Sequence, residues 1–179
     1  MIKTESNTLQ AFWVGLGALS SFSLSIVSAI ILSRYFDKIE YGTYRQIVYV
    51  YNTLLVVFSA GLPRVFSYYL PRYSKEEGKD IMIKISLILF FTGFLFSLIL
   101  YSASDLIATL LHNPQLALGL KYFSPVPMLL LPTLGVEGIF ASYKQTKYTA
   151  VYTALSRLLM LIFIVLPVII FGSNYLFAV

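Results

Sequence analysis

The sequence contains no cysteine, and His112 is the only histidine among its 179 residues. Without cysteine there are no disulfides and no thiolate metal ligands, and one histidine leaves no cluster for a metal site or a proton relay. Charge is scarce too, because Asp, Glu, Lys and Arg make up 12% of the chain, about half of the ~25% usual in soluble domains. A soluble protein with so little charge would expose large apolar patches.

Motifs for nucleotide, metal and nucleophile chemistry are missing as well. The chain has no Walker A motif, no Gly-rich dinucleotide turn, no HExxH and no evident acid–base pair. We therefore expect no enzymatic activity, no cofactor and no metal. The net charge of +5 fits basic residues that flank membrane helices, so we expect no nucleic-acid partner.

Apolar residues are abundant, with 58% hydrophobic content and a mean hydropathy of +0.80. They form five stretches, at residues 9–33, 46–71, 85–104, 122–142 and 149–172. A bilayer core of about 30 Å needs roughly 20 helical residues to cross it, and continuous apolar runs favour helices over barrel strands. We expect an all-α integral membrane protein with about five transmembrane helices in a single domain.

The loop charges predict an orientation. The N-terminus and the loops 72–84 and 143–148 together hold seven Lys and Arg residues, and the loops 34–45 and 105–121 hold four. Because positive charge accumulates on the cytoplasmic side, we expect the N-terminus in the cytoplasm and the chain in the cytoplasmic (inner) membrane. Within the last loop, a short interfacial helix and a turn at Asn113-Pro114 are expected.

Helix-breaking residues interrupt three of the stretches. Gly61-Leu62-Pro63 predicts a kink in the second stretch, since proline removes a donor and clashes with the preceding turn. The fourth stretch holds Pro125, Pro127 and Pro132, and the fifth holds Pro167. Such breaks are typical of transporter helices that line a cavity, although proline is also simply more frequent in membrane helices. Three glycines, Gly15, Gly17 and Gly93, are predicted to be close-packing positions.

Four charged residues lie in or beside the apolar stretches. Arg45 opens the second stretch, whereas Arg64, Glu137 and Arg157 lie inside stretches, where a charge usually faces a partner or a wet path. Glu137 and Arg157 fall at depths about one turn apart, which predicts an ion pair; snorkelling of each side chain to the surface is the alternative.

Two of these cations suggest a cargo site. Arg64 and Arg157 are predicted to face a shared cavity and to bind an anionic cargo such as a pyrophosphate, since attraction strengthens as solvent screening falls. The alternatives are a structural role or binding of anionic lipid.

The first two stretches carry the most distinctive letters. The first ends in Ser33-Arg34-Tyr35-Phe36, Tyr41-Gly42-Thr43-Tyr44 follows, and the second stretch exits through SYYLPRYSKEEG after the Gly61-Leu62-Pro63 break. This pattern resembles the polysaccharide biosynthesis and export proteins, the Wzx-type oligosaccharide flippases of the multidrug/oligosaccharidyl-lipid/polysaccharide exporter superfamily. Carried over from the resemblance, Arg34, Tyr41 and Gly42 are signature positions with a structural role. Gly42 is expected to need a backbone geometry that other residues resist.

The resemblance implies a function and a larger fold. It implies a two-lobed bundle of 12 to 14 helices that moves undecaprenyl-pyrophosphate-linked oligosaccharide across the membrane in O-antigen, capsule or exopolysaccharide synthesis. About five helices make a partial lobe, so residues 1–179 are expected to be the N-terminal part of a longer transporter. The expected partners are lipid-linked oligosaccharide, membrane lipids and other polysaccharide-assembly membrane proteins.

Three other functions remain open at this point. A multidrug exporter of the same superfamily would be expected to use cavity carboxylates for cationic drugs. A membrane glycan polymerase or ligase would be expected to carry a large outer loop with catalytic Arg or His. A structural membrane subunit is the third alternative.

Overall fold

The chain is α-helical in a computed structural model that describes residues 7–171 and 174–178, and none of these residues lies in a β-strand. The elements in chain order are α1 (Asn7–Tyr35), α2 (Lys38–Ser59), α3 (Leu62–Tyr69), η1 (Leu70–Arg72), α4 (Lys75–Ser102), α5 (Ser104–Leu110), α6 (Pro114–Phe123), α7 (Val126–Leu130), η2 (Leu131–Leu134), α8 (Gly135–Ser142), α9 (Thr146–Phe171) and η3 (Tyr175–Ala178). The predicted leader with Lys3, and the final residue of the predicted span 149–172, lie outside the described residues.

The predicted membrane architecture is confirmed. Four helical segments are long and apolar enough to cross a bilayer, and a bent pair makes a fifth if it is counted as one span. The four are Thr8–Tyr35, Glu76–Ser102, Pro114–Ser142 and Thr146–Phe171, and the bent pair is Lys38–Ser59 with Leu62–Arg72. The chain is therefore an all-α, multi-pass membrane protein.

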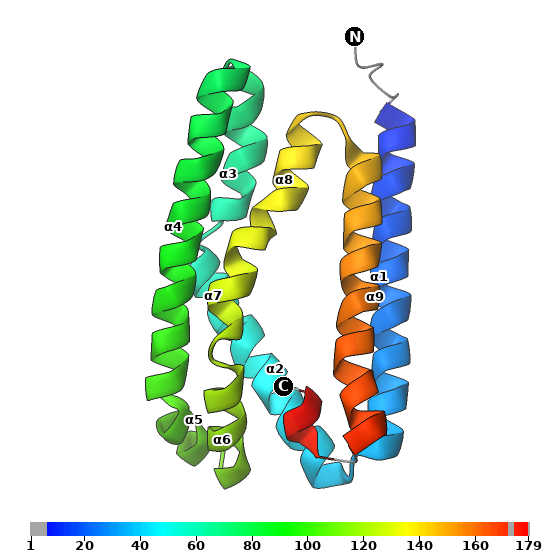
Figure 1. Ribbon diagram of the computed structural model, residues 1–179, viewed down its shortest axis with the longest axis vertical. Helices are drawn as coiled ribbons and strands as arrows, with labels where there is room; N and C mark the ends of the chain where they lie inside the picture. The colour runs from blue at the N-terminus through cyan, green and yellow to red at the C-terminus, as the bar shows by residue number, and fades with distance from the viewer. Residues whose placement is uncertain (1–6, 172–173, 179) are drawn as a thin grey trace.

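The helices run between two ends of an elongated bundle (Figure 1). The start of α1 and the turns α3–α4 and α8–α9 lie at the upper end in that view. The turn α1–α2 and the helices α5 and α6 lie at the lower end. The loops that hold most of the positive charge thus share one end. The side of the membrane that each end faces stays a prediction.

Helix α2 begins at Lys38, eight residues before the predicted start at residue 46. A capping box explains the earlier start, because the Asp37 carboxylate accepts from the Glu40 backbone N–H at 2.7 Å and the Glu40 carboxylate accepts from the Asp37 N–H at 3.3 Å. The box satisfies donors that the first turn leaves open. The predicted 34–45 loop is consequently reduced to a tight turn around residues 36–37.

The kink predicted in the second stretch is present. Helices α2 and α3 meet at 45° across a two-residue break. Ala60 and Gly61 both adopt left-handed backbone angles there, with φ of 46° and 71°. Pro63 then falls in the first turn of α3, where its missing N–H costs nothing. Among the glycines that the structure describes, Gly61 is the one with a positive φ.

The proline-rich fourth stretch is a series of short helices. It begins at Pro114 rather than at residue 122, and α6, α7, η2 and α8 follow one another to Ser142. The break near Pro127 is compensated by a neighbouring helix, because the Met128 N–H donates to the Ser97 hydroxyl at 3.0 Å. Helix α9, by contrast, continues through Pro167.

Helices α2, α4 and α6 share the main core, and an upper cluster joins α3 to α4. Aromatic rings stack in the first, where Phe96 lies 4.6 Å from Phe58 and 5.8 Å from Tyr51 between ring centroids. Phe66 and Leu89, both fully buried, centre the second. In a bilayer such contacts stabilise through packing rather than through exclusion of water.

Three helix contacts depend on glycine. A Cβ at Gly17 would lie 3.2 Å from the Ala150 Cα, so α1 packs closely along α9. A Cβ at Gly93 would lie 2.9 Å from the Pro127 carbonyl oxygen of α7, and one at Gly138 would lie 2.7 Å from the Pro63 carbonyl oxygen of α3. The predicted close contacts at Gly17 and Gly93 are confirmed, whereas Gly15 faces open space.

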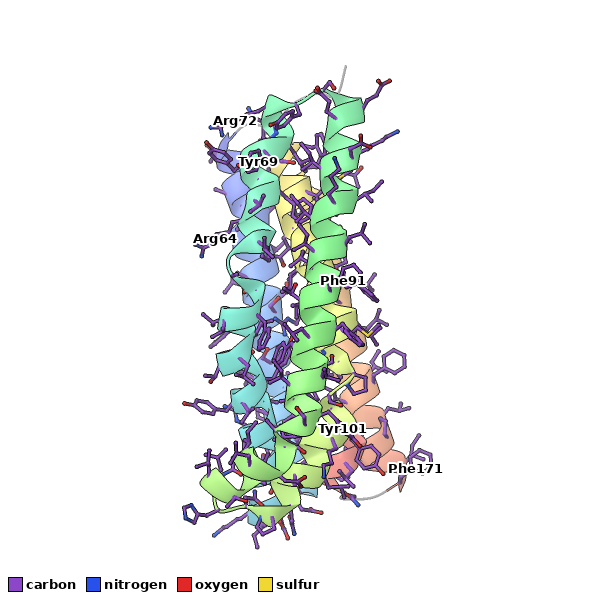
Figure 2. All side chains as sticks on the ribbon, turned by 90° about the vertical axis from the view of Figure 1, so that its left-hand side faces the viewer. Arg64, Tyr69, Arg72, Phe91, Tyr101 and Phe171 are labelled. Carbon is purple, nitrogen blue, oxygen red and sulfur yellow. The ribbon has the colours of Figure 1, made fainter. Side chains whose placement is uncertain are left out.

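Large apolar side chains cover much of the outer surface. Phe91 on α4 and Phe171 at the end of α9 are 66% and 69% exposed, and both project away from the bundle (Figure 2). An apolar surface of this extent indicates contact with lipid or with other membrane helices.

Candidate functional site

A pocket of about 170 Å³ lies between α2 and the α1–α9 pair. Helix α1 contributes its lower half, α2 its first turns and α9 its central turns. The lining is mostly apolar, with polar groups supplied by Ser25, Ser28, Tyr41, Tyr44, Arg45 and Arg157. A pocket with a few convergent polar groups is the arrangement expected of a binding site.

Two arginines reach this pocket from different helices. Because α2 begins at Lys38, Arg45 lies about two turns inside the helix rather than at its opening. Arg157 lies eleven residues, or about 16 Å, along the 26-residue α9. It is therefore near the middle of its span and deeper than the two turns expected from the sequence. At that depth an arginine faces a protein partner or a wet path.

The pocket is electropositive. Its lining residues include no Asp or Glu, and among the described residues neither guanidinium has a carboxylate within 4.0 Å. One Arg157 N–H group contacts the Met160 sulfur at 4.0 Å. The two cations are left with most of their N–H donors open, and a guanidinium in this state binds phosphate or carboxylate through paired hydrogen bonds.

The size of the pocket limits what it holds. A water molecule occupies about 30 Å³ of liquid, so 170 Å³ has room for about six waters or for a small anionic group. Drug-sized ligands need roughly 300–1,000 Å³. The geometry therefore suits the charged head of a larger molecule whose remaining part lies outside the pocket.

Arg64 does not line this pocket. It lies in the first turn of α3, on the far side of the Gly61 bend, and its side chain is exposed. Figure 2 shows Arg64 projecting from the bundle on the side away from α4. The structure thus separates Arg64 from Arg157, and the prediction that the two arginines share one cavity is wrong. The 45° bend between α2 and α3 is the reason, because α3, which carries Arg64, does not continue along the axis of α2.

The predicted ion pair between Glu137 and Arg157 is not formed in the described part of the chain. The Glu137 carboxylate instead accepts a hydrogen bond from the Thr153 hydroxyl at 3.1 Å. Thr153 is the α9 residue level with Glu137, and Arg157 lies one further turn, about 6 Å, along the helix. The predicted depths of Glu137 and Arg157 differed by about one turn. That difference is enough for Thr153, rather than Arg157, to become the partner of Glu137.

The three signature residues have separate environments. Arg34 lies in the last turn of α1, where its charge is favourable at the negative end of the helix dipole. Tyr41 lines the pocket and packs against the main core. The expectation for Gly42 is wrong, because it lies inside α2 without a positive φ, and a Cβ there would meet open space.

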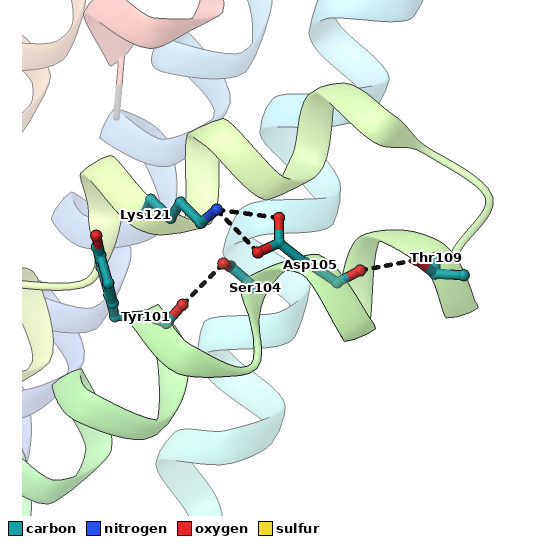
Figure 3. A network of polar contacts seen from close by, with 5 residues as sticks. All are labelled: Tyr101, Ser104, Asp105, Thr109 and Lys121. Carbon is teal, nitrogen blue, oxygen red and sulfur yellow. Dashed lines mark hydrogen bonds and ion pairs between the residues drawn. The ribbon is translucent and has the colours of Figure 1, made fainter.

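Polar contacts hold α5 and α6 together at the lower end of the bundle and join α6 to α2. Figure 3 shows Lys121 bridging to both Asp105 oxygens, at 2.9 and 3.0 Å, in an ion pair that is largely exposed. Asn113 joins α6 to α2, because its amide donates to the Thr43 hydroxyl at 2.9 Å and to the Gln46 side chain at 2.7 Å. Its carbonyl oxygen also caps α6.

The sequence does contain a signal for the position of Arg45 inside a helix. Asp37-x-x-Glu40 is a capping-box pattern, and it would have placed the start of the helix at residue 38. From that start, Tyr41, Tyr44, Arg45 and Val48 share one face at helical spacing, and all four line the pocket. The serines of α1 gave no comparable signal.

Comparison with known proteins agrees with the resemblance at the level of the family. The family model described as polysaccharide biosynthesis protein matches residues 9–179. No curated protein and no solved structure matches the chain.

Proposed function

The chain belongs to the polysaccharide biosynthesis protein family, and from this membership and its cationic pocket we propose that it takes part in flipping a lipid-linked oligosaccharide. The cargo is undecaprenyl-pyrophosphate-linked oligosaccharide, moved across the cytoplasmic membrane during O-antigen, capsule or exopolysaccharide synthesis. The protein is of the Wzx-type flippase class. The single observation that supports this most is the pair Arg45 and Arg157, which line one pocket without an acidic residue.

The pyrophosphate is the part of such a cargo that resists transfer through lipid. Charged groups are costly at the centre of a bilayer, so a flippase must replace the hydration of the phosphates. Arg45 and Arg157 supply forked N–H donors for this, and the Tyr41, Tyr44 and Ser28 hydroxyls add neutral donors. The pocket accommodates the head group, and the sugars and the polyprenyl chain lie outside it.

The charge of the site favours this cargo over a cationic drug. A multidrug exporter would place carboxylates in its cavity, and none lines this pocket. Glu137 is engaged by Thr153 through a hydrogen bond. In this proposal the protein moves its cargo across the membrane and neither makes nor breaks a covalent bond, so it is not an enzyme.

The proposed orientation of the chain places the pocket in one half of the membrane. With the upper end in the cytoplasm, the pocket lies in the outer half of the membrane, because it is lined by the lower turns of α1 and the first turns of α2. Arg64, in the upper half and without a carboxylate partner among the described residues, is then an earlier contact for the cargo. The proposed partners are the lipid-linked oligosaccharide, membrane lipids and other polysaccharide-assembly membrane proteins.

The test is complementation of a deletion strain. Arg45→Ala and Arg157→Ala are each expected to lower surface polysaccharide about tenfold or more, because a hydrogen bond to a charged group contributes about 1.5–3 kcal/mol. Lipid-linked oligosaccharide should accumulate in the inner leaflet. Lys121→Ala removes a cation outside the pocket and serves as the matched control. Normal polysaccharide in the Arg45→Ala, Arg157→Ala double variant, at normal membrane levels of protein, would overturn the proposal.

A further inference from the structure

A second cationic surface lies at the upper end, where α3 passes through η1 to the turn before α4. It consists of Tyr68, Tyr69, Arg72 and Tyr73, here called the Arg72 cluster. The Arg72 guanidinium carbon lies 3.6 Å from the centre of the Tyr68 ring. Tyr69 stands edge-on to Tyr68 at 5.0 Å and stacks with Tyr73 at 6.3 Å, both measured between centroids.

The fold fixes the direction in which this cluster faces. Phe66 and Leu70, on the opposite face of the same segment, are buried against α4, and Phe66 also packs on α8. The tyrosines of the cluster are 42–57% exposed. Figure 2 shows Tyr69 and Arg72 on the same side of the bundle, away from α4. The two buried anchors therefore hold three rings and one cation outward at the end of a membrane span.

The binding capacity of Arg72 is not used within the described part of the chain. Arg72 lies over the face of Tyr68, which leaves the N–H edge of the guanidinium open. The acidic residues that follow in α4 do not pair with it. Glu77 is engaged in the capping box of α4, whose N-cap residue is Ser74: its carboxylate accepts from the Ser74 N–H at 3.0 Å and from the Ser74 hydroxyl at 2.8 Å.

We propose that the Arg72 cluster binds the phosphate of an anionic phospholipid headgroup. Tyrosine rings at the end of a span lie at the headgroup level of a bilayer, and basic residues there attract anionic lipids. A guanidinium that lies flat on a ring presents a forked edge to a phosphate. Tyr68 thus orients Arg72, and the Tyr69 and Tyr73 hydroxyls border the headgroup. The inference does not depend on transport.

The test measures lipid binding to the whole chain in a nonionic detergent. Short-chain phosphatidylglycerol is titrated and counted by native mass spectrometry, with phosphatidylcholine of the same chain length as the neutral reference. Arg72→Ala is expected to weaken phosphatidylglycerol binding about tenfold, because it removes the charge-assisted hydrogen bonds between the guanidinium and the lipid phosphate. Arg72→Lys should recover part of this, since it restores the charge without the fork.

Two further variants separate the cluster from general charge and from folding. Tyr68→Leu keeps every charge and is expected to weaken binding two- to fivefold, because Arg72 loses its support. Lys79→Ala removes an exposed cation on the neighbouring first turns of α4 and should leave binding unchanged. Unchanged thermal unfolding of Arg72→Ala would show that the fold is intact.

Three results would overturn the inference. The first is equal loss of binding in Arg72→Ala and Lys79→Ala, which would make the effect one of general charge. The second is equal affinity for the two phospholipids. The third is binding of inorganic pyrophosphate as tight as that of phosphatidylglycerol and equally dependent on Arg72, which would make the cluster a site for a soluble anion.

Discussion

Replacing Gly93 by alanine should destabilise the bundle at the contact between α4 and α7. The added Cβ would lie 2.9 Å from the Pro127 carbonyl oxygen and 3.0 Å from the Met128 Cα. Both are backbone atoms, so neither can rotate away as a side chain would. Overpacking of this kind costs about 1–3 kcal/mol. Alanine is also a better helix former than glycine, which returns about 1 kcal/mol. The net expectation is a loss of stability of up to about 2 kcal/mol.

Gly15→Ala is the matched control for this substitution. It introduces the same methyl group into another long membrane helix, at a position with nothing within 4 Å. The helix-propensity gain then applies without the clash. We therefore expect Gly93→Ala to be less stable than Gly15→Ala by about 1–3 kcal/mol. Denaturant unfolding in one detergent, with all three proteins at equal concentration, measures this difference. Equal stabilities of the two variants would refute the close approach of α4 and α7.

Two other predictions concern the lower end of the bundle. Asn113→Ala should lower the free energy of unfolding by about 1–3 kcal/mol, because it removes both side-chain bonds to α2 and the cap of α6; a loss under ~0.5 kcal/mol in denaturant unfolding would contradict this. Lys121→Ala should change the same quantity by less than about 1 kcal/mol, because its ion pair with Asp105 is largely exposed; a larger loss would show that this pair is shielded from water.

Structural features that depend on local chemistry could be predicted from the sequence. Continuous apolar length predicted the four helical segments long enough to span a bilayer and the bent pair α2–α3, and Gly61 followed by Pro63 predicted the bend. The positive charge of the loops predicted that the turns α3–α4 and α8–α9 lie on the same side of the membrane, and both lie at the upper end of the bundle. Each of these follows from neighbouring residues and the thickness of a bilayer, so no knowledge of helix packing was needed.

The contacts between helices, and the pocket that they form, could not be predicted from the sequence. Helix α1 packs along α9, which lies more than 100 residues further along the chain, and this contact places Gly17 against Ala150 and leaves Gly15 open. The pocket depends on the same contact, because α1 and α9 supply two of its three walls. An error of eight residues in the start of α2 was enough to misplace Arg45. In a helical bundle, a shift of one turn changes which side chains meet.

The most direct test of the central claim is the electrostatic character of the pocket. Because the chain has no cysteine, Ser28→Cys places a single thiol in the pocket lining. Rates of modification by an anionic and a cationic thiosulfonate reagent are compared, and each is divided by the rate for a free thiol.

For Ser28→Cys we expect the normalised rate with the anionic reagent to exceed that with the cationic reagent. The ratio of these two rates should fall when Arg157→Ala is added to the Ser28→Cys variant. Phe163→Cys, whose native side chain is 73% exposed and does not line this pocket, should stay unreactive in the membrane. A thiol at position 28 that is as unreactive as the one at position 163, or a ratio that Arg157→Ala does not change, would contradict a water-filled cationic site.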